Sequence, residues 1–119
     1  MTQQSAITIH LPPLPDFSDA ILEGVSIGPR RAVTLELTPL VWVGSQGHYG
    51  LPITVRLGGI VGLEEVAAFF AKHQLPADIA GLSYATGHVS KPNAQFLELI
   101  FERVEAQIVI QCHSVTVTD

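Results

Sequence analysis

The side chains in this sequence that could carry chemistry are five histidines, one cysteine and two nearby aspartates. A metal site can be recognised in a sequence by closely spaced ligands, as in His-Glu-x-x-His or Cys-x-x-Cys, and neither pattern occurs. No two histidines stand at a spacing that places them on one face of a helix. We therefore expect no metal site and no cofactor. The histidines are His10, His48, His73, His88 and His113.

The cysteine, Cys112, directly precedes His113. Adjacent residues of a strand point to opposite faces, so the imidazole is poorly placed to activate the thiol. We expect Cys112 to be a buried apolar filler. A single cysteine also excludes an intramolecular disulfide and is typical of a reducing compartment, which favours a cytoplasmic location.

Asp16 and Asp19 lie beside Ser18 and could serve as an acid and base pair in a hydrolase. Carboxylates at this spacing more often hydrogen-bond the local backbone in turns. No phosphate-binding loop and no nucleophile elbow occurs. We predict no catalytic residues and a non-enzymatic protein. The alternative is a small enzyme or ligand-binding domain whose cleft brings together at least two of Asp16, Asp19, His10, His48, His88 and His113.

Composition excludes further classes of protein. The 119 residues carry a net charge of -5 with six Lys and Arg, which argues against nucleic acid and against anionic membranes as partners. No signal peptide or membrane span is apparent. The length predicts a single globular domain over residues 1–119. With 47% hydrophobic and 14% charged residues, the chain is expected to reserve some surface for a partner.

The clearest element is a β-hairpin within residues 20–43. Its second arm alternates apolar and polar residues with the period of a half-buried strand. Paired residues must share a face, which favours a three-residue loop of residues 29–31. That loop sets Ile27 against Val33 and Val25 against Leu35, with Arg31 in the left-handed conformation.

The same register places Glu23 opposite Leu37 on the apolar face, where we expect its carboxylate to reach water at the rim.

The remaining elements give an α+β fold, a mainly antiparallel twisted β-sheet with one helix packed on it. Apolar residues at i, i+3, i+4 and i+7 predict a helix from about Leu63 to Leu75, with Lys72 and His73 in its last turn. Residues 95–105 fit either a helix or a buried strand. The other predicted strands are an edge strand over 5–11, a long strand over 53–57 and a strand over 107–118 that is central at its start and near an edge at its end.

Exposed aromatic residues are the best functional candidates, because such residues anchor protein interfaces. The glycine-rich segment 44–50 predicts a contact loop next to Trp42. We predict that the protein-binding residues are Trp42, Gln46, His48 and Tyr49, with Leu51 and Tyr84 as further exposed candidates; a core position for Trp42 is the alternative.

Three segments carry a resemblance to a known family: 16–22, with its Asp-Ala pair, 53–60, which ends in Gly-Gly-Ile, and the alternating 108–117. Together they resemble the immunity protein 50 family of bacterial toxin-immunity systems, although Ser18 stands where that family has histidine. The resemblance implies a mainly β fold with one helix, a strand at 95–102 and binding without catalysis.

The partner implied by this resemblance is another protein, such as a basic toxin, which an acidic patch on one face would suit. The other alternative is a structural homodimer that uses the low charge content and an exposed strand edge.

Overall fold

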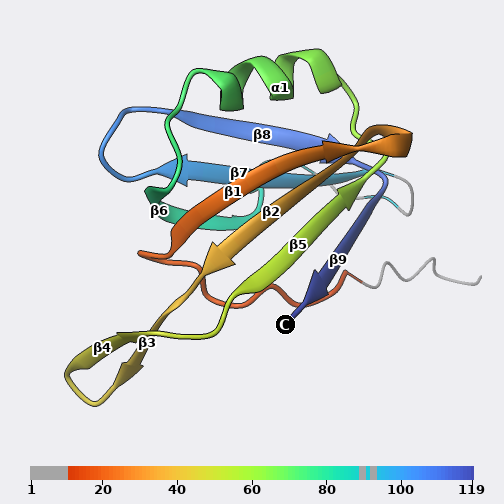
Figure 1. Ribbon diagram of the computed structural model, residues 1–119. Helices are drawn as coiled ribbons and strands as arrows, with labels where there is room; N and C mark the ends of the chain where they lie inside the picture. The colour runs from red at the N-terminus through yellow and green to blue at the C-terminus, as the bar shows by residue number, and fades with distance from the viewer. Residues whose placement is uncertain (1–10, 89–90, 92–93) are drawn as a thin grey trace, which may run out of the picture.

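Seven antiparallel strands form one curled sheet and two further strands form a separate hairpin in the computed structural model, which describes residues 11–88, 91 and 94–119 (Figure 1). The order in the large sheet is β8-β7-β6-β1-β2-β5-β9. With one α-helix, this is the predicted α+β class. The elements are β1 (Ile21–Gly28), β2 (Ala32–Thr38), β3 (Leu40–Val43), β4 (Gln46–Tyr49), β5 (Ile53–Gly58), α1 (Leu63–Ala71), β6 (Ala77–Tyr84), β7 (Gln95–Phe101), β8 (Gln107–Cys112) and β9 (Ser114–Thr118).

The predicted hairpin is formed by β1 and β2, and its predicted register is confirmed next to the loop. Ile27 pairs with Val33 and Val25 pairs with Leu35. Residues 29–31 make a short 3-10 turn, in which both Arg30 (φ 61°) and Arg31 (φ 56°) adopt the left-handed conformation. The sequence predicted that conformation for the second arginine alone.

Glu23 does not lie opposite Leu37 as predicted. The register shifts between Leu22 and Gly24, so that Leu22 pairs with Leu37 and Glu23 is left over at the irregularity. The side chain of Glu23 is exposed, as expected, and its Oε2 accepts a hydrogen bond of 2.6 Å from Thr38 Oγ1.

The predicted C-terminal strand 107–118 is two strands, β8 and β9, which occupy opposite ends of the sheet order. The strand is interrupted at His113, whose N–H donates a hydrogen bond to the carbonyl of Gly58, 2.8 Å away. Gly59 (φ +65°) lies against this interruption, and a Cβ on Gly59 would stand 2.8 Å from His113 Cγ. The two ends of the sheet therefore meet beside the end of β5, and β8 is not central.

The ambiguous segment 95–105 contains the strand β7, which lies between β6 and β8. Leu97, Leu99 and Phe101 are buried on one face, while the residues between them are half-buried. Hydrogen-bonding neighbours on both sides select the strand over the helix, because they satisfy its backbone groups within the sheet.

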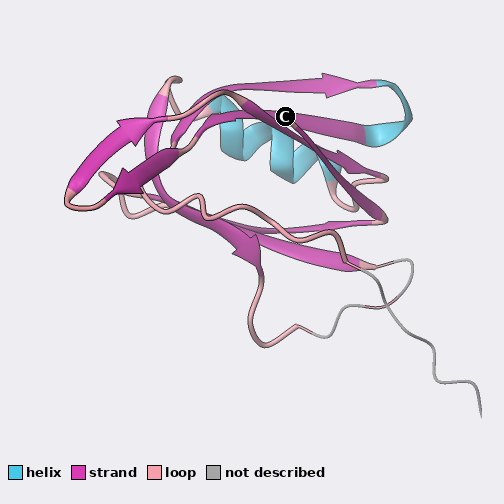
Figure 2. Cartoon of the chain, turned by 90° about the horizontal axis from the view of Figure 1, so that it is seen from below, coloured by secondary structure: helices cyan, strands magenta, loops and turns pink. Residues whose placement is uncertain are grey.

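In Figure 1 helix α1 lies at the top of the curled sheet and segment 11–20 runs along its bottom, which Figure 2 shows from below. Val66 and Phe70 of α1 and Phe17 of that segment are buried in one hydrophobic cluster with the inner face of the sheet. The helix ends at Ala71, earlier than predicted, so Lys72 and His73 follow it and are not part of its last turn.

Most of the predicted edge strand 5–11 lies outside the described residues; Leu11 belongs to no strand. Across residues 11–88, 91 and 94–119, no helix is long and apolar enough to cross a membrane.

Candidate interaction site

A two-stranded hairpin projects from the end of the sheet where β2 ends and β5 begins (Figure 1). We call residues 39–51 the arm. Its strands are β3 and β4, joined by a turn in which Gly44 has φ +63°, and its base is closed by a 2.8 Å hydrogen bond from Gly50 N–H to the carbonyl of Pro39. The predicted contact loop 44–50 is thus mostly a strand, because β3 supplies its pairing partner.

Large apolar side chains on the arm are exposed. Trp42 is 60% exposed, so it is not part of the core. Five of the nine large apolar residues that are exposed in the described part of the chain belong to the arm: Val41, Trp42, Val43, Tyr49 and Leu51.

The arm has two different faces, because residues paired across an antiparallel hairpin share a face. Trp42 pairs with Gly47 and Leu40 pairs with Tyr49; we call these four residues the aromatic face. A Cβ on Gly47 would lie 3.2 Å from Leu40 Cδ1 and 3.4 Å from Trp42 Cη2, so the indole lies over this glycine.

The opposite face of the arm pairs Val41 with His48 and Val43 with Gln46. The four residues predicted from the sequence are thus all on the arm, but they divide between its faces. Trp42 and Tyr49 lie on the aromatic face, and Gln46 and His48 on the other.

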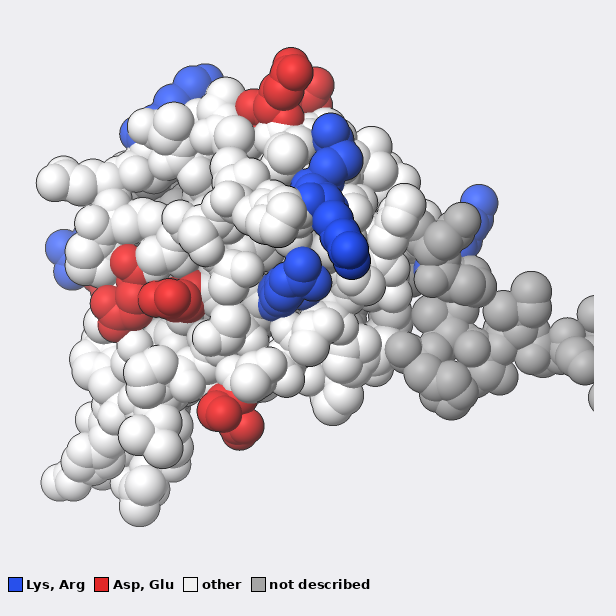
Figure 3. Space-filling view, turned by 45° about the vertical axis from the view of Figure 1, so that its right-hand side comes forward, with Lys and Arg blue, Asp and Glu red and all other residues white. Residues whose placement is uncertain are grey.

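The arm carries no charged side chain. No Asp, Glu, Lys or Arg occurs between Glu36 and Arg56, and the projecting part of Figure 3 contains none. The absence of charge from residues 37–55 is visible in the sequence, and it would have pointed to Val41 and Val43 as further site residues.

Acidic side chains do not gather into one patch on the face that Figure 3 shows. They form separate groups with Lys and Arg side chains between them. Along the chain, acidic residues are likewise spread over separate elements, for example Glu64 in α1, Glu36 in β2 and Glu102 after β7. This face gives no support to the acidic patch expected for binding a basic toxin.

The described aspartates and histidines of the alternative catalytic cleft belong to four different places in the fold, with Asp16 and Asp19 together in the segment before β1. Asp16 Oδ1 accepts a hydrogen bond of 2.9 Å from Ser18 N–H, and bonding to Ser18 lowers the pKa of this carboxyl, which confirms its role in a turn. His48 lies on the arm, His88 follows β6 and His113 separates β8 from β9.

Within the described ranges, no hydrogen bond joins any two of Asp16, Asp19, His48, His88 and His113, and no group of three or more His, Cys, Asp and Glu residues is placed to hold a metal. His10 lies outside those ranges.

Two other residues singled out in the sequence are structural. Cys112 is fully buried, and its burial raises the pKa of the thiol to about 11, so it is a neutral filler at physiological pH. Tyr84 is partly buried rather than exposed, and its hydroxyl donates to the carbonyl of Pro12 at 2.7 Å. Burial is also the main cause that raises the pKa of Tyr84.

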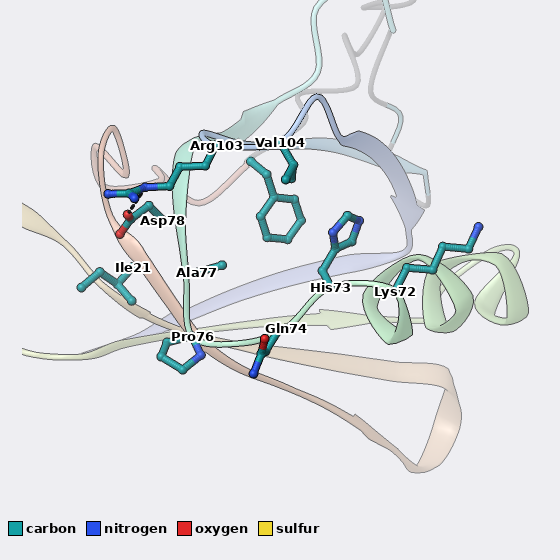
Figure 4. Close-up of a pocket in the computed structure, with 10 residues that line it drawn as sticks. Ile21, Lys72, His73, Gln74, Pro76, Ala77, Asp78, Arg103 and Val104 are labelled. Atoms are coloured by element: carbon teal, nitrogen blue, oxygen red, sulfur yellow. Dashed lines mark ion pairs between the residues drawn. The ribbon is translucent and has the colours of Figure 1, made fainter.

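A hollow of about 620 Å³ lies where the end of α1 meets the start of β6 and the segment after β7 (Figure 4). At one edge of it Arg103 Nε pairs with Asp78 Oδ2 at 3.1 Å, and Lys72 points away from it. The ring of His73 stacks on Phe101, with centroids 4.6 Å apart, and also packs on Phe69. The lining of this hollow includes no serine, threonine, cysteine or tyrosine, and its His73 and Asp78 are engaged by Phe101 and Arg103.

Comparison with known proteins finds no matching family model, no matching curated protein and no matching solved structure. The resemblance to the immunity protein 50 family therefore stays a prediction.

Proposed function

We propose that this protein is a non-enzymatic protein-binding module and that the arm is its contact surface. The observation that carries this proposal is the exposure of five large apolar side chains on an uncharged, projecting hairpin. The two aromatic residues among them, Trp42 and Tyr49, are of the types that dominate binding energy at protein interfaces.

The area of exposed apolar surface supports this role. The five side chains are 46–83% exposed, so together they present on the order of 600 Å² of surface to water, divided between the two faces of the arm. Exposed apolar surface concentrated on one projecting element often marks an interaction site. A two-stranded hairpin is also only marginally stable on its own, so a partner that covers the arm would stabilise it.

The chemistry of the arm favours a protein over other partners. Nucleic acid requires Lys or Arg at the contact, and the arm has neither. A small molecule requires a concave site, whereas the arm projects. Its turn is formed by Gly44 and Ser45, which are poorly suited to enter a bilayer first.

An immunity-type function, which the sequence resemblance implies, is a narrower form of the same proposal. In that form the arm binds a toxin through apolar contacts, and complementary charge is not the main source of affinity. The product of the adjacent reading frame is the first partner to examine, because an immunity protein is expected to be encoded beside its toxin.

Site-specific photo-cross-linking in the organism of origin tests the proposal. A photoreactive phenylalanine analogue replaces Tyr49 in one variant and Ile27 in another, since both side chains are about half exposed and Ile27 lies on the large sheet. We expect a discrete cross-linked protein from position 49 that is lost when Trp42→Ser is added. Equal products from both positions, or none from position 49, would contradict the proposal.

A further inference from the structure

The arm is suited to contact a second copy of itself. We propose that the aromatic face of one chain packs on the same face of a second chain, related by a twofold axis, to form a weak symmetric dimer. This inference rests on the proposed function, because it identifies the protein that the arm binds.

Charge distribution is the first argument. In a twofold contact each surface meets itself, so any charged group near the axis faces an identical charge. The arm avoids this repulsion because no charged residue occurs between Glu36 and Arg56, although the whole chain carries a net charge of -5. A surface evolved for a basic partner would instead be expected to carry carboxylates.

Geometry is the second argument. The arm projects beyond the sheet, so two arms can meet while the acidic bodies stay apart (Figure 1). Gly47 has no side chain, and the indole of Trp42 lies over it, which leaves Trp42 and Tyr49 as the exposed aromatic groups of this face. Offset stacking or edge contacts between such rings contribute about 0.5–1.5 kcal/mol beyond their burial.

The available area predicts a weak dimer. Trp42, Tyr49 and Leu40, with Leu51 at the base of the arm, would bury on the order of 900 Å² over two copies, below the roughly 1,200–2,000 Å² of stable complexes. We therefore expect monomer at about 10 µM and substantial dimer at about 1 mM.

Sedimentation velocity over this concentration range tests the inference. We expect the weight-average mass to rise towards the dimer, and added salt to leave it unchanged or raise it, since salt screens the repulsion between acidic bodies. Trp42→Ser should weaken dimerisation at least about tenfold. The matched control Ile27→Ser, on the large sheet and also about half exposed, should leave it within about twofold. Circular dichroism checks that both variants keep the fold.

Tryptophan fluorescence supplies a second readout, because Trp42 is the only tryptophan. Dimerisation through the aromatic face should shift its emission to shorter wavelength and protect it from acrylamide as concentration rises. A chain that stays monomeric at about 1 mM overturns the inference, as does a dimer that Trp42→Ser does not weaken or that Ile27→Ser weakens equally.

The failure of this inference can be separated from failure of the proposed function. A monomeric chain whose position 49 still cross-links to a different protein rejects the second copy and retains the binding role. A monomeric chain with no cross-link from position 49 rejects both.

Discussion

The large sheet and the arm are built from the same kind of antiparallel β structure, but they differ in what covers their side chains. The inner face of the large sheet is closed by the curl of the sheet, by α1 and by segment 11–20, and Leu35 and Leu97 there are fully buried. In the arm, Trp42 and Val43 are mostly exposed. Apolar residues alone therefore do not make a core; a second layer must cover them.

The largest expected effect is a loss of stability from a substitution in the large sheet that has no counterpart in the arm. Leu35 is fully buried between Val25 of β1 and Val55 of β5. Leu35→Ala should lower the free energy of unfolding by about 2–5 kcal/mol, because it removes packed methyl groups and leaves a cavity. The control Val43→Ala on the arm should change it by less than about 0.5 kcal/mol. Urea denaturation measures both free energies. Equal losses would mean that the large sheet and the arm contribute alike to stability.

A glycine substitution tests how the sheet closes on itself. Gly59→Ala forces a Cβ to within 2.8 Å of His113 Cγ at a positive φ, so it should cost about 1–3 kcal/mol of stability. Gly81→Ala is the matched control, since a Cβ there meets nothing within 4 Å and no strained φ is involved. Thermal and urea unfolding of the two variants should differ clearly; similar stabilities would mean that the junction at His113 adjusts freely.

The buried thiol of Cys112 predicts that the stability of the large sheet depends on pH. Its pKa is raised from 9.0 to about 11, so the folded chain holds this proton more tightly than the unfolded chain. The contribution to stability is fully present below pH 9 and falls as pH rises towards 11. Urea denaturation between pH 8 and 10.5 should show a steeper decline for the wild type than for Cys112→Val. Parallel curves would contradict this assignment.

The smallest effect is expected at the hollow beside α1. Arg103 pairs with Asp78, but its side chain is 84% exposed, so solvent screens the interaction. Arg103→Gln should change the free energy of unfolding by less than about 1 kcal/mol. A loss comparable to that of Leu35→Ala would mean that this surface is part of the structural core.

Local patterns in the sequence were sufficient for elements whose partners are close along the chain. The β1–β2 register followed from matching apolar faces across a short loop, and α1 followed from its apolar stripe. Prediction failed where a distant partner decides the structure. The residue types of segment 44–50 predict a loop, but pairing with β3 makes most of it a strand. Segment 107–118 alternates throughout and gives no sign of the interruption at His113.

The candidate site was located by sequence but not resolved by it. Trp42 and Tyr49 were identified as interface residues because of their chemistry, yet the choice between core and surface for Trp42 depends on whether another layer covers the arm. The separation of Gln46 and His48 onto the opposite face depends on the pairing of β3 with β4.

The sequence by itself determined the α+β class, the main hairpin and its register next to the loop, the absence of charge on residues 37–55 and the net acidity of the chain. These are properties of composition and short-range periodicity. Only the tertiary structure decided that the two ends of the sheet meet at His113, that residues 95–101 form a strand and that the arm stands clear of the core. Each of these outcomes depends on backbone hydrogen bonds or burial between residues far apart in the chain, and a local pattern carries no information about them.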